Sequence, residues 1–160
     1  AKYPSNNLNY IKLIEDRLLV IAPKNYYDSK PNYSYLPLED ILNKKILLRE
    51  KGSGTRSLLE KVLKKKEISI DDLNIKAFIE DPETIKELVH LGVGISFLSE
   101  RAIADDINLG KYKAYYVDEV DLSRKFYFVY HNKRQLSPLN ETFKTFVLDY
   151  INEFSTKTSI

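Results

Sequence analysis

The chain has 160 residues, of which 43% are hydrophobic and 30% charged, a composition that fits an ordinary globular domain and excludes a disordered or membrane-embedded chain. Its 25 basic and 23 acidic residues nearly cancel, so no global field directs it to nucleic acid or to a membrane. Cysteine and methionine are both absent: the first absence excludes disulfides and suits a reducing compartment such as the cytoplasm, and the second suggests an excised fragment or removal of the initiator.

The first third of the chain predicts a strand, a loop and a short helix. Residues 1–16 are polar and are expected to be irregular, whereas residues 18–22 form a continuous apolar run that predicts a buried strand. Residues 25–37 are rich in Tyr, Asn, Ser and Pro and indicate a loop. Residues 37–42 begin with proline and predict a short helix.

The most informative stretch is residues 49–59, which read Arg-Glu-Lys-Gly-Ser-Gly-Thr-Arg-Ser-Leu-Leu. It joins a short apolar run of strand type to a helical pattern at 56–66, with Ser53 or Thr55 placed to cap the helix. Free N–H groups at a helix start, together with the helix dipole, favour an anion, and Arg56 adds a positive charge. The stretch predicts a site for a small anionic or polar ligand. The alternative is an ordinary glycine turn and helix cap, with Arg56 in solvent.

The middle of the chain predicts further strands and helices. Residues 75–79 indicate a strand, and Asp81-Pro82-Glu83 then forms a strong helix start, with an N-cap Asp, a Pro at the first helical position and an acid in the first turn. That helix is expected to end at Gly92 and to lead into a buried strand at 93–98. Residues 100–107 predict the next helix.

The last third predicts two strands and a long amphipathic helix. Residues 114–117 and 126–130 are rich in Tyr, Phe and Val, as strands are. A helix is expected to begin near Ser137-Pro138. Its apolar stripe consists of Leu139, Phe143, Phe146, Val147, Tyr150, Ile151 and Phe154.

The alternation of strands and helices predicts an α/β fold, with a mostly parallel sheet, flanking helices and right-handed crossovers. In such sheets, ligands lie at the carboxyl ends of the strands, where the helix N-termini point. The turn at 52–56 and the helix start at 81–84 both follow predicted strands. We therefore expect the two helix starts to converge on one cleft.

Other polar patterns have ordinary structural explanations. His90 and His131 lie far apart without Asp, Glu or Cys at ligand spacing, so no metal or cofactor is expected. Gly92 and Gly94 indicate a helix stop and close packing rather than a phosphate loop. Since no nucleophile motif is present, an enzyme is not expected. The adjacent carboxylate pairs are expected on solvated faces and at helix caps; they are Glu80-Asp81, Asp105-Asp106 and Asp118-Glu119.

Taken together, these segments resemble the C-terminal effector-binding (substrate-binding) domain of LysR-type transcriptional regulators. The resemblance extends from about Leu18 to the end of the chain, and its most specific part is the helix–glycine–strand segment at 85–98. The other matching stretches follow in family order at 18–23, 36–41, 48–56 and 126–138.

The resemblance implies a type 2 periplasmic-binding-protein-like fold, in which two α/β lobes are joined by crossover strands and an effector binds between them. Residues 24–117 would form the second, inserted lobe, nearly complete. Residues 1–23 and 118–160 would supply the crossover strands and partial elements of the first lobe. The DNA-binding domain and the opening elements of the first lobe have no counterpart in this sequence.

Carried over by position, the resemblance also implies ligand-binding residues. They are Ser53, Gly54, Thr55 and Arg56, with Asp81 and Thr84 as weaker candidates. The implied partners are a small anionic effector and other copies of the same chain, which would form a homo-oligomer through the effector domain. DNA would be bound through the absent winged helix, and no membrane is implied.

The leading hypothesis is a cytoplasmic ligand-sensing domain that controls DNA binding by its parent protein. Because part of the cleft is expected to be missing, we expect this fragment to bind effector weakly or not at all compared with its parent. One alternative is a lobe of a solute-binding protein that serves a transporter. Another is an enzyme for a phosphorylated substrate, although acid, base and metal candidates are lacking.

Overall fold

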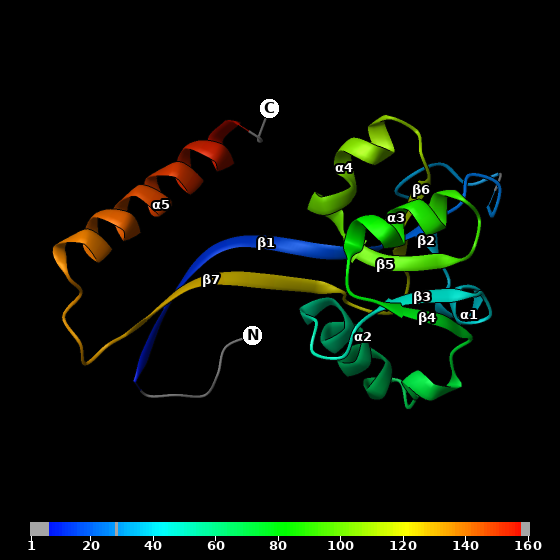
Figure 1. Cartoon of the computed structure of the whole chain (residues 1–160), viewed down its shortest axis with the longest axis horizontal. Coiled ribbons are helices and arrows are strands. Elements are labelled where there is room, and N and C mark those ends of the chain that lie inside the picture. Colours follow the sequence, from blue (N-terminus) through cyan, green and yellow to red (C-terminus); the bar gives the residue numbers. More distant parts are fainter. Residues whose placement is uncertain (1–6, 28, 158–160) are drawn as a thin grey trace. The chain divides into compact units, whose positions relative to one another are not determined.

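The computed structural model describes residues 7–27 and 29–157 (Figure 1). The chain forms β1 (Leu8–Ala22), β2 (Tyr35–Leu36), α1 (Leu38–Leu42), β3 (Ile46–Arg49), α2 (Gly54–Lys65), a 3-10 helix (Ile70–Asp72), β4 (Ile75–Ile79), α3 (Pro82–His90), β5 (Ile95–Ser99), α4 (Glu100–Asn108), β6 (Lys113–Val117), β7 (Ser123–His131) and α5 (Pro138–Lys157). The strands and helices expected from residue 18 onward are all present, which confirms the α/β class. The side chain of Phe154, expected on the apolar stripe of α5, lies outside the described residues.

The expectation of an irregular segment at 1–16 is wrong from Leu8 onward, because β1 already begins there and pairs with β7. Side chains in this part of the strand, such as Lys12 and Glu15, are exposed. Backbone pairing holds the segment extended, and its apolar side chains, such as Leu8 and Ile11, are only partly buried, so no continuous apolar run marks it in the sequence. The loop expected at 25–37 likewise contains the short strand β2, which pairs in parallel with β6.

The sheet has the strand order β2-β6-β1-β5-β3-β4, and β7 pairs with β1 off this row. β3 runs parallel to both β4 and β5, and β2 runs parallel to β6. β1 is antiparallel to β5 and to β6, so these two neighbours share one direction. The sheet is therefore mostly parallel, as expected, and the carboxyl ends of β2, β6, β5, β3 and β4 meet at one edge.

Helices cover both faces of this sheet. Along β1, Leu18 and Val20 join a hydrophobic cluster with side chains from α1 and α2, whereas Leu19 and Ile21 join a separate cluster with side chains from α3 and α4. The alternation follows from the two-residue period of a strand. Figure 1 shows α3 and α4 on one side of the sheet and α2 on the other.

The connections explain why α2 and α3 lie on opposite faces. α2 leads outward from β3 to the edge strand β4, whereas α3 leads from β4 back across β3 to β5. With right-handed crossovers, a reversal of direction places the next helix on the other face. The connections after β3 and β4 therefore leave toward opposite faces of the sheet. Open α/β sheets hold ligands beside the carboxyl ends of two such strands.

The chain divides into two compact units, Arg17–Ser123 and a second unit made of Ala1–Asp16 with Arg124–Ile160. Every hydrophobic side chain that is buried in the described part of the chain belongs to the first unit. The division of the chain into lobes, with 24–117 as one of them, remains a prediction. Within the described residues, no helix is long and apolar enough to cross a membrane.

Candidate functional site

The turn between β3 and α2 has the geometry of a helix cap. Gly52 adopts a φ of +99°, a conformation that side chains disfavour, and so turns the chain toward the helix. Ser53 is the N-cap residue of α2, and its hydroxyl oxygen accepts the N–H of Arg56 at 3.1 Å. Ser53 and Thr55 are each only 8% exposed. Ser53 thus caps the N–H of Arg56, and the dipole of α2 favours an anion at this helix start.

Arg56 is held in place by two neighbours. Its Nε donates to Oε1 of Glu60 at 2.7 Å, and its guanidinium carbon lies 4.5 Å from the centre of the Phe78 ring on β4. The side chain is only 13% exposed, so the alternative in which Arg56 points into solvent is wrong. The residue supplies an oriented positive charge at the helix start, although Glu60 partly neutralises it.

The start of α3 is already occupied by a carboxylate. Asp81 is the N-cap residue, and its Oδ2 accepts the backbone N–H of Thr84 at 2.8 Å and the hydroxyl of Thr84 at 2.7 Å. These two hydrogen bonds from Thr84, the hydroxyl first, hold the pKa of Asp81 below its usual value. Pro82 brings no N–H to this turn. An added anion would meet the charge of Asp81 here, so the α2 start is the better anion site.

The two helix starts share one edge of the sheet. Arg49, the last residue of β3, lies opposite Ile79, the last residue of β4, in a parallel pair. Ser53 and Asp81 therefore follow adjacent strand ends, on connections that leave toward opposite faces. The structure thus places both turns at this edge, on connections to opposite faces, while the expected convergence of the two helix starts on one cleft stays a prediction.

We expect Ser53→Ala to lower the free energy of unfolding by about 1 kcal/mol, because the substitution removes the acceptor for the N–H of Arg56. Ser57→Ala, on the exposed surface of the same helix, is the matched control and should change stability by less than about 0.5 kcal/mol. Urea unfolding followed by circular dichroism compares the two variants. An equal loss in both would show that the Ser53 cap contributes nothing specific.

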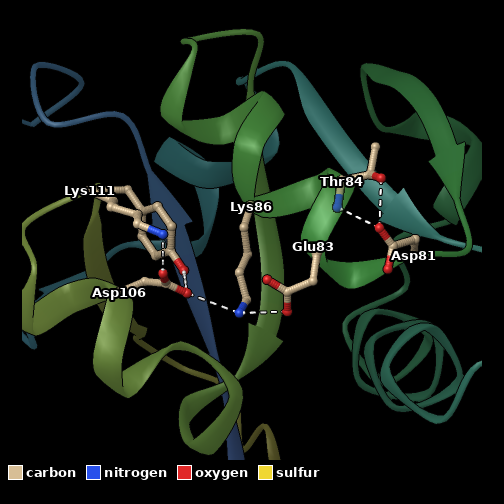
Figure 2. Close-up of polar contacts among 7 residues, drawn as sticks. Asp81, Glu83, Thr84, Lys86, Asp106 and Lys111 are labelled. Atoms are coloured by element: carbon tan, nitrogen blue, oxygen red, sulfur yellow. Dashed lines mark hydrogen bonds and ion pairs between the residues drawn. The ribbon is translucent and has the colours of Figure 1, made fainter.

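A second polar cluster connects α3 to α4 and the start of β6 (Figure 2). Nζ of Lys86 pairs with Glu83 at 2.8 Å and with Asp106 at 2.9 Å. Asp106 also pairs with Lys111 at 2.7 Å and accepts the hydroxyl of Tyr112 at 3.1 Å. The expectation that the carboxylates at 105–106 lie on solvated faces is therefore wrong for Asp106, whose side chain is 13% exposed. This cluster fastens α4 to α3 and is a structural element.

The charges in this cluster shift the pKa values of Asp106 and Lys86. The hydrogen bond from Lys111 is the largest cause that lowers the pKa of Asp106 to about 2; burial opposes it, and Lys86 and Tyr112 add to it. Burial alone would lower the pKa of Lys86, but its bonds to Glu83 and Asp106 outweigh that and raise it. Lys86 and Asp106 are consequently both ionised near neutral pH.

The sequence left some partners of the site unidentified. The spacing of Arg56 and Glu60 by four residues is a recognisable helical ion-pair signal. The contact of Arg56 with Phe78 has no such signal, since it depends on β4 lying beside α2. Within the described part of the chain, no group of His, Cys, Asp or Glu side chains is placed to hold a metal ion. His90, on α3, is exposed, and its Nδ1 lies 2.8 Å from the backbone oxygen of Lys111.

Comparisons with protein families and with individual proteins agree on the kind of protein that this chain is similar to. The sequence pattern of the LysR substrate binding domain matches residues 2–152. The chain is 32% identical over 152 residues to the HTH-type transcriptional activator CmpR of Synechocystis sp., covering 94% of this chain and 47% of that protein. It is 34% identical over 110 residues to the HTH-type transcriptional regulator CbbR of Sinorhizobium medicae, covering 69% of this chain and 34% of that protein. The chain thus spans about half the length of these relatives or less, and both are regulators rather than enzymes.

Two solved structures share the fold. The regulatory domain of Synechocystis PCC6803 CcmR, in complex with 2-PG, superposes with a TM-score of 0.78 at 24% identity, covering 94% of this chain and 70% of that chain. The effector binding domain of QuiR, in complex with shikimate, gives a TM-score of 0.75 at 21% identity, covering 94% and 69%. These domains have the type 2 periplasmic-binding-protein-like fold, which confirms the expected fold class.

Proposed function

The chain belongs to the family of LysR substrate-binding domains, and from this premise we propose that it senses a small anionic effector at the start of α2 and thereby controls DNA binding by a longer parent protein. Ser53, Gly54, Thr55 and Arg56 would contact the effector, with Asp81 and Thr84 beside them. The observation that carries this proposal is the α2 start itself, where backbone donors and an oriented guanidinium lie at the carboxyl edge of β3.

The ligands of the two structural neighbours support the chemistry. CcmR was captured with 2-PG, which is 2-phosphoglycolate, and QuiR with shikimate. Both compounds are acids that ionise near neutral pH. An anion of this kind would accept N–H groups of the α2 turn and pair with Arg56, with the helix dipole adding to the attraction. We accordingly propose an acidic metabolite as the effector class of this chain.

The wider role follows from the relatives. We propose that DNA is contacted through an HTH region of the parent protein, that the parent assembles as a homo-oligomer through its effector domains, and that it works in the cytoplasm, where it meets DNA. An effector changes such an assembly only if it binds two arrangements of the protein with different affinities. A lobe of a transport-linked solute-binding protein is the alternative, and the regulatory relatives disfavour it. We also propose that the chain has no catalytic activity.

Charge substitutions at the α2 start test the proposal. With 2-phosphoglycolate as the probe and calorimetry as the measurement, Arg56→Gln should weaken binding roughly 10-fold, because it removes a charge-assisted hydrogen bond. Glu60→Gln should tighten binding by about 2- to 5-fold, since it frees Arg56 from its partner and removes a negative charge.

The opposite signs separate a binding role from a structural one. If the Arg56–Glu60 pair only stabilised α2, both substitutions would act in the same direction. Shikimate, inorganic phosphate and sulfate serve as comparison ligands. Failure of every one of these anions to bind either the wild-type chain or its longer parent protein, or an unchanged affinity in Arg56→Gln, would contradict the proposal.

A further inference from the structure

A separate cavity of about 320 Å³ lies beside the carboxyl ends of β2 and β6. These two strands are at the opposite end of the strand order from β3 and β4. We name it the Arg17 pocket; its lining includes Arg17, Tyr35, Tyr116, Val117, Glu119 and Asp121. Its size is at the lower limit of roughly 300–1,000 Å³ that small-molecule sites occupy. β1 and β5 separate β6 from β3 in the sheet order, so this pocket is distinct from the α2 start.

The carboxylates that line the pocket already have partners. Glu119 pairs with Lys66 at 3.5 Å. Asp121 accepts the N–H of Ser123 at 2.9 Å; the hydroxyl of Ser123 first, and this N–H second, hold the pKa of Asp121 below its usual value, and the nearby charge of Arg17 lowers it further. Neither carboxylate forms a hydrogen bond or ion pair with the guanidinium, so its N–H donors remain for a ligand.

The guanidinium of Arg17 lies over an aromatic ring. Its guanidinium carbon lies 5.2 Å from the centre of the Tyr116 ring. Among the described residues, its guanidinium makes no hydrogen bond or ion pair. A cation–π contact leaves the N–H groups of a guanidinium able to donate, and two of them match the two oxygens of a carboxylate.

Two tyrosine rings form the wall beside it. Tyr35 and Tyr116 are opposite each other in the β2–β6 pair, with ring centres 5.1 Å apart and planes inclined by 31°. The hydroxyl of Tyr116 donates to Oε1 of Glu100 at 3.3 Å, which fixes that ring. Tyr35 is 53% exposed and so offers an open aromatic face. An aromatic ring stacked on it would gain about 0.5–1.5 kcal/mol beyond simple burial.

We propose that the Arg17 pocket is a second ligand site, which binds a small planar aromatic monocarboxylate with its carboxylate on Arg17 and its ring against Tyr35. A dianion such as a phosphate ester is disfavoured here, because Glu119 and Asp121 lie in the lining and a single guanidinium opposes them. The two sites of the chain thus select different acids. This proposal does not depend on effector binding at the α2 start.

Benzoate is the probe, titrated into the full chain and followed by calorimetry and by the NMR signals of the Arg17 side chain. Arg17→Gln should weaken binding roughly 10-fold or more, because it removes a bidentate charged contact, and Arg17→Lys should restore only part of the affinity. Tyr35→Ala should weaken binding about 5-fold through the lost stacking surface. Cyclohexanecarboxylate, with equal charge and a puckered ring, should bind more weakly than benzoate.

Arg101→Gln, which makes the same substitution on the exposed surface of α4, is the matched control and should leave benzoate affinity unchanged. The proposal is overturned if benzoate shows no saturable binding, if Arg17→Gln binds as the wild type does, or if Arg101→Gln weakens binding as much as Arg17→Gln. Circular dichroism confirms that each variant is folded, and the partial rescue by Arg17→Lys distinguishes lost recognition from lost structure.

Discussion

Asp106→Asn is expected to lower the free energy of unfolding by about 3 kcal/mol at neutral pH, as breaking a largely buried ion pair does. The substitution keeps the side-chain volume but removes the charge that Lys86 and Lys111 share. Lys86 is then left with Glu83, whose side chain is 73% exposed and compensates poorly. Urea unfolding followed by circular dichroism measures the loss.

The matched control is Asp105→Asn, which changes the same chemical group at the exposed neighbouring position. It should alter the free energy of unfolding by less than about 0.5 kcal/mol. Equal effects of the two substitutions would show that the cluster in Figure 2 has no special role in stability.

The pH dependence of the free energy of unfolding provides a second test of the role of Asp106. The pKa of Asp106 is about 2 in the folded chain and near its ordinary value of 3.8 in the unfolded chain. Its stabilising contribution is therefore complete above about pH 4 and is lost as the pH falls toward 2, and it amounts to about 2 kcal/mol. The stability difference between wild type and Asp106→Asn should accordingly shrink by that amount between about pH 5 and pH 2. A difference that is constant over this range would exclude the proposed ionisation.

Gly94→Ala is expected to destabilise the chain by about 3 kcal/mol, because there is no space for a methyl group at this position. A Cβ on Gly94 would lie 2.5 Å from the backbone oxygen of Lys45, which cannot move away as a side chain can. The same oxygen accepts the N–H of Ile95 at 2.9 Å where β5 joins β3. Relief of the clash would separate these two central strands at their first pair.

Gly110→Ala separates this clash from ordinary glycine effects. Gly110 has a φ of +65°, and a Cβ there would meet only the end of the Lys24 side chain at 3.8 Å. Its substitution should therefore cost only the backbone strain of a left-handed residue, about 1 kcal/mol. Thermal and urea unfolding of both variants provide the comparison. If Gly94→Ala is no worse than Gly110→Ala, the close approach of β5 to Lys45 is not rigid.

Local signals predicted much of this structure. The bounds of β4 at 75–79 and the N-cap Asp81 were predicted directly, because both depend on residues adjacent in sequence. The close packing expected at Gly94 is also confirmed. The sharing of one sheet edge by the two helix starts followed from the alternation of elements, and the pairing of Arg49 with Ile79 confirms it. Their convergence on one cleft stays a prediction.

Contacts between distant elements could not be predicted in this way. Lys86 and Asp106 are 20 positions apart, and their pairing depends on α3 and α4 lying side by side on one face. The first half of β1 is held by backbone pairing with β7, and its apolar side chains are not fully buried. It therefore has no continuous apolar run that would mark it as a strand in the sequence. The roles of Ser53, Gly54, Thr55, Arg56, Asp81 and Thr84 in ligand binding stay predictions.

Among the side chains that the structure describes, all buried apolar ones lie between Leu18 and Leu122, which has a consequence for cooperativity. A segment without an interior of its own contributes little enthalpy or heat capacity to a melting transition. Calorimetric unfolding of the whole chain should therefore report mainly on Arg17–Ser123, while α5 and the outer half of β1 behave as a separate foldon that opens at lower cost. Ser53, Gly94 and Asp106 all belong to the part that sets the midpoint.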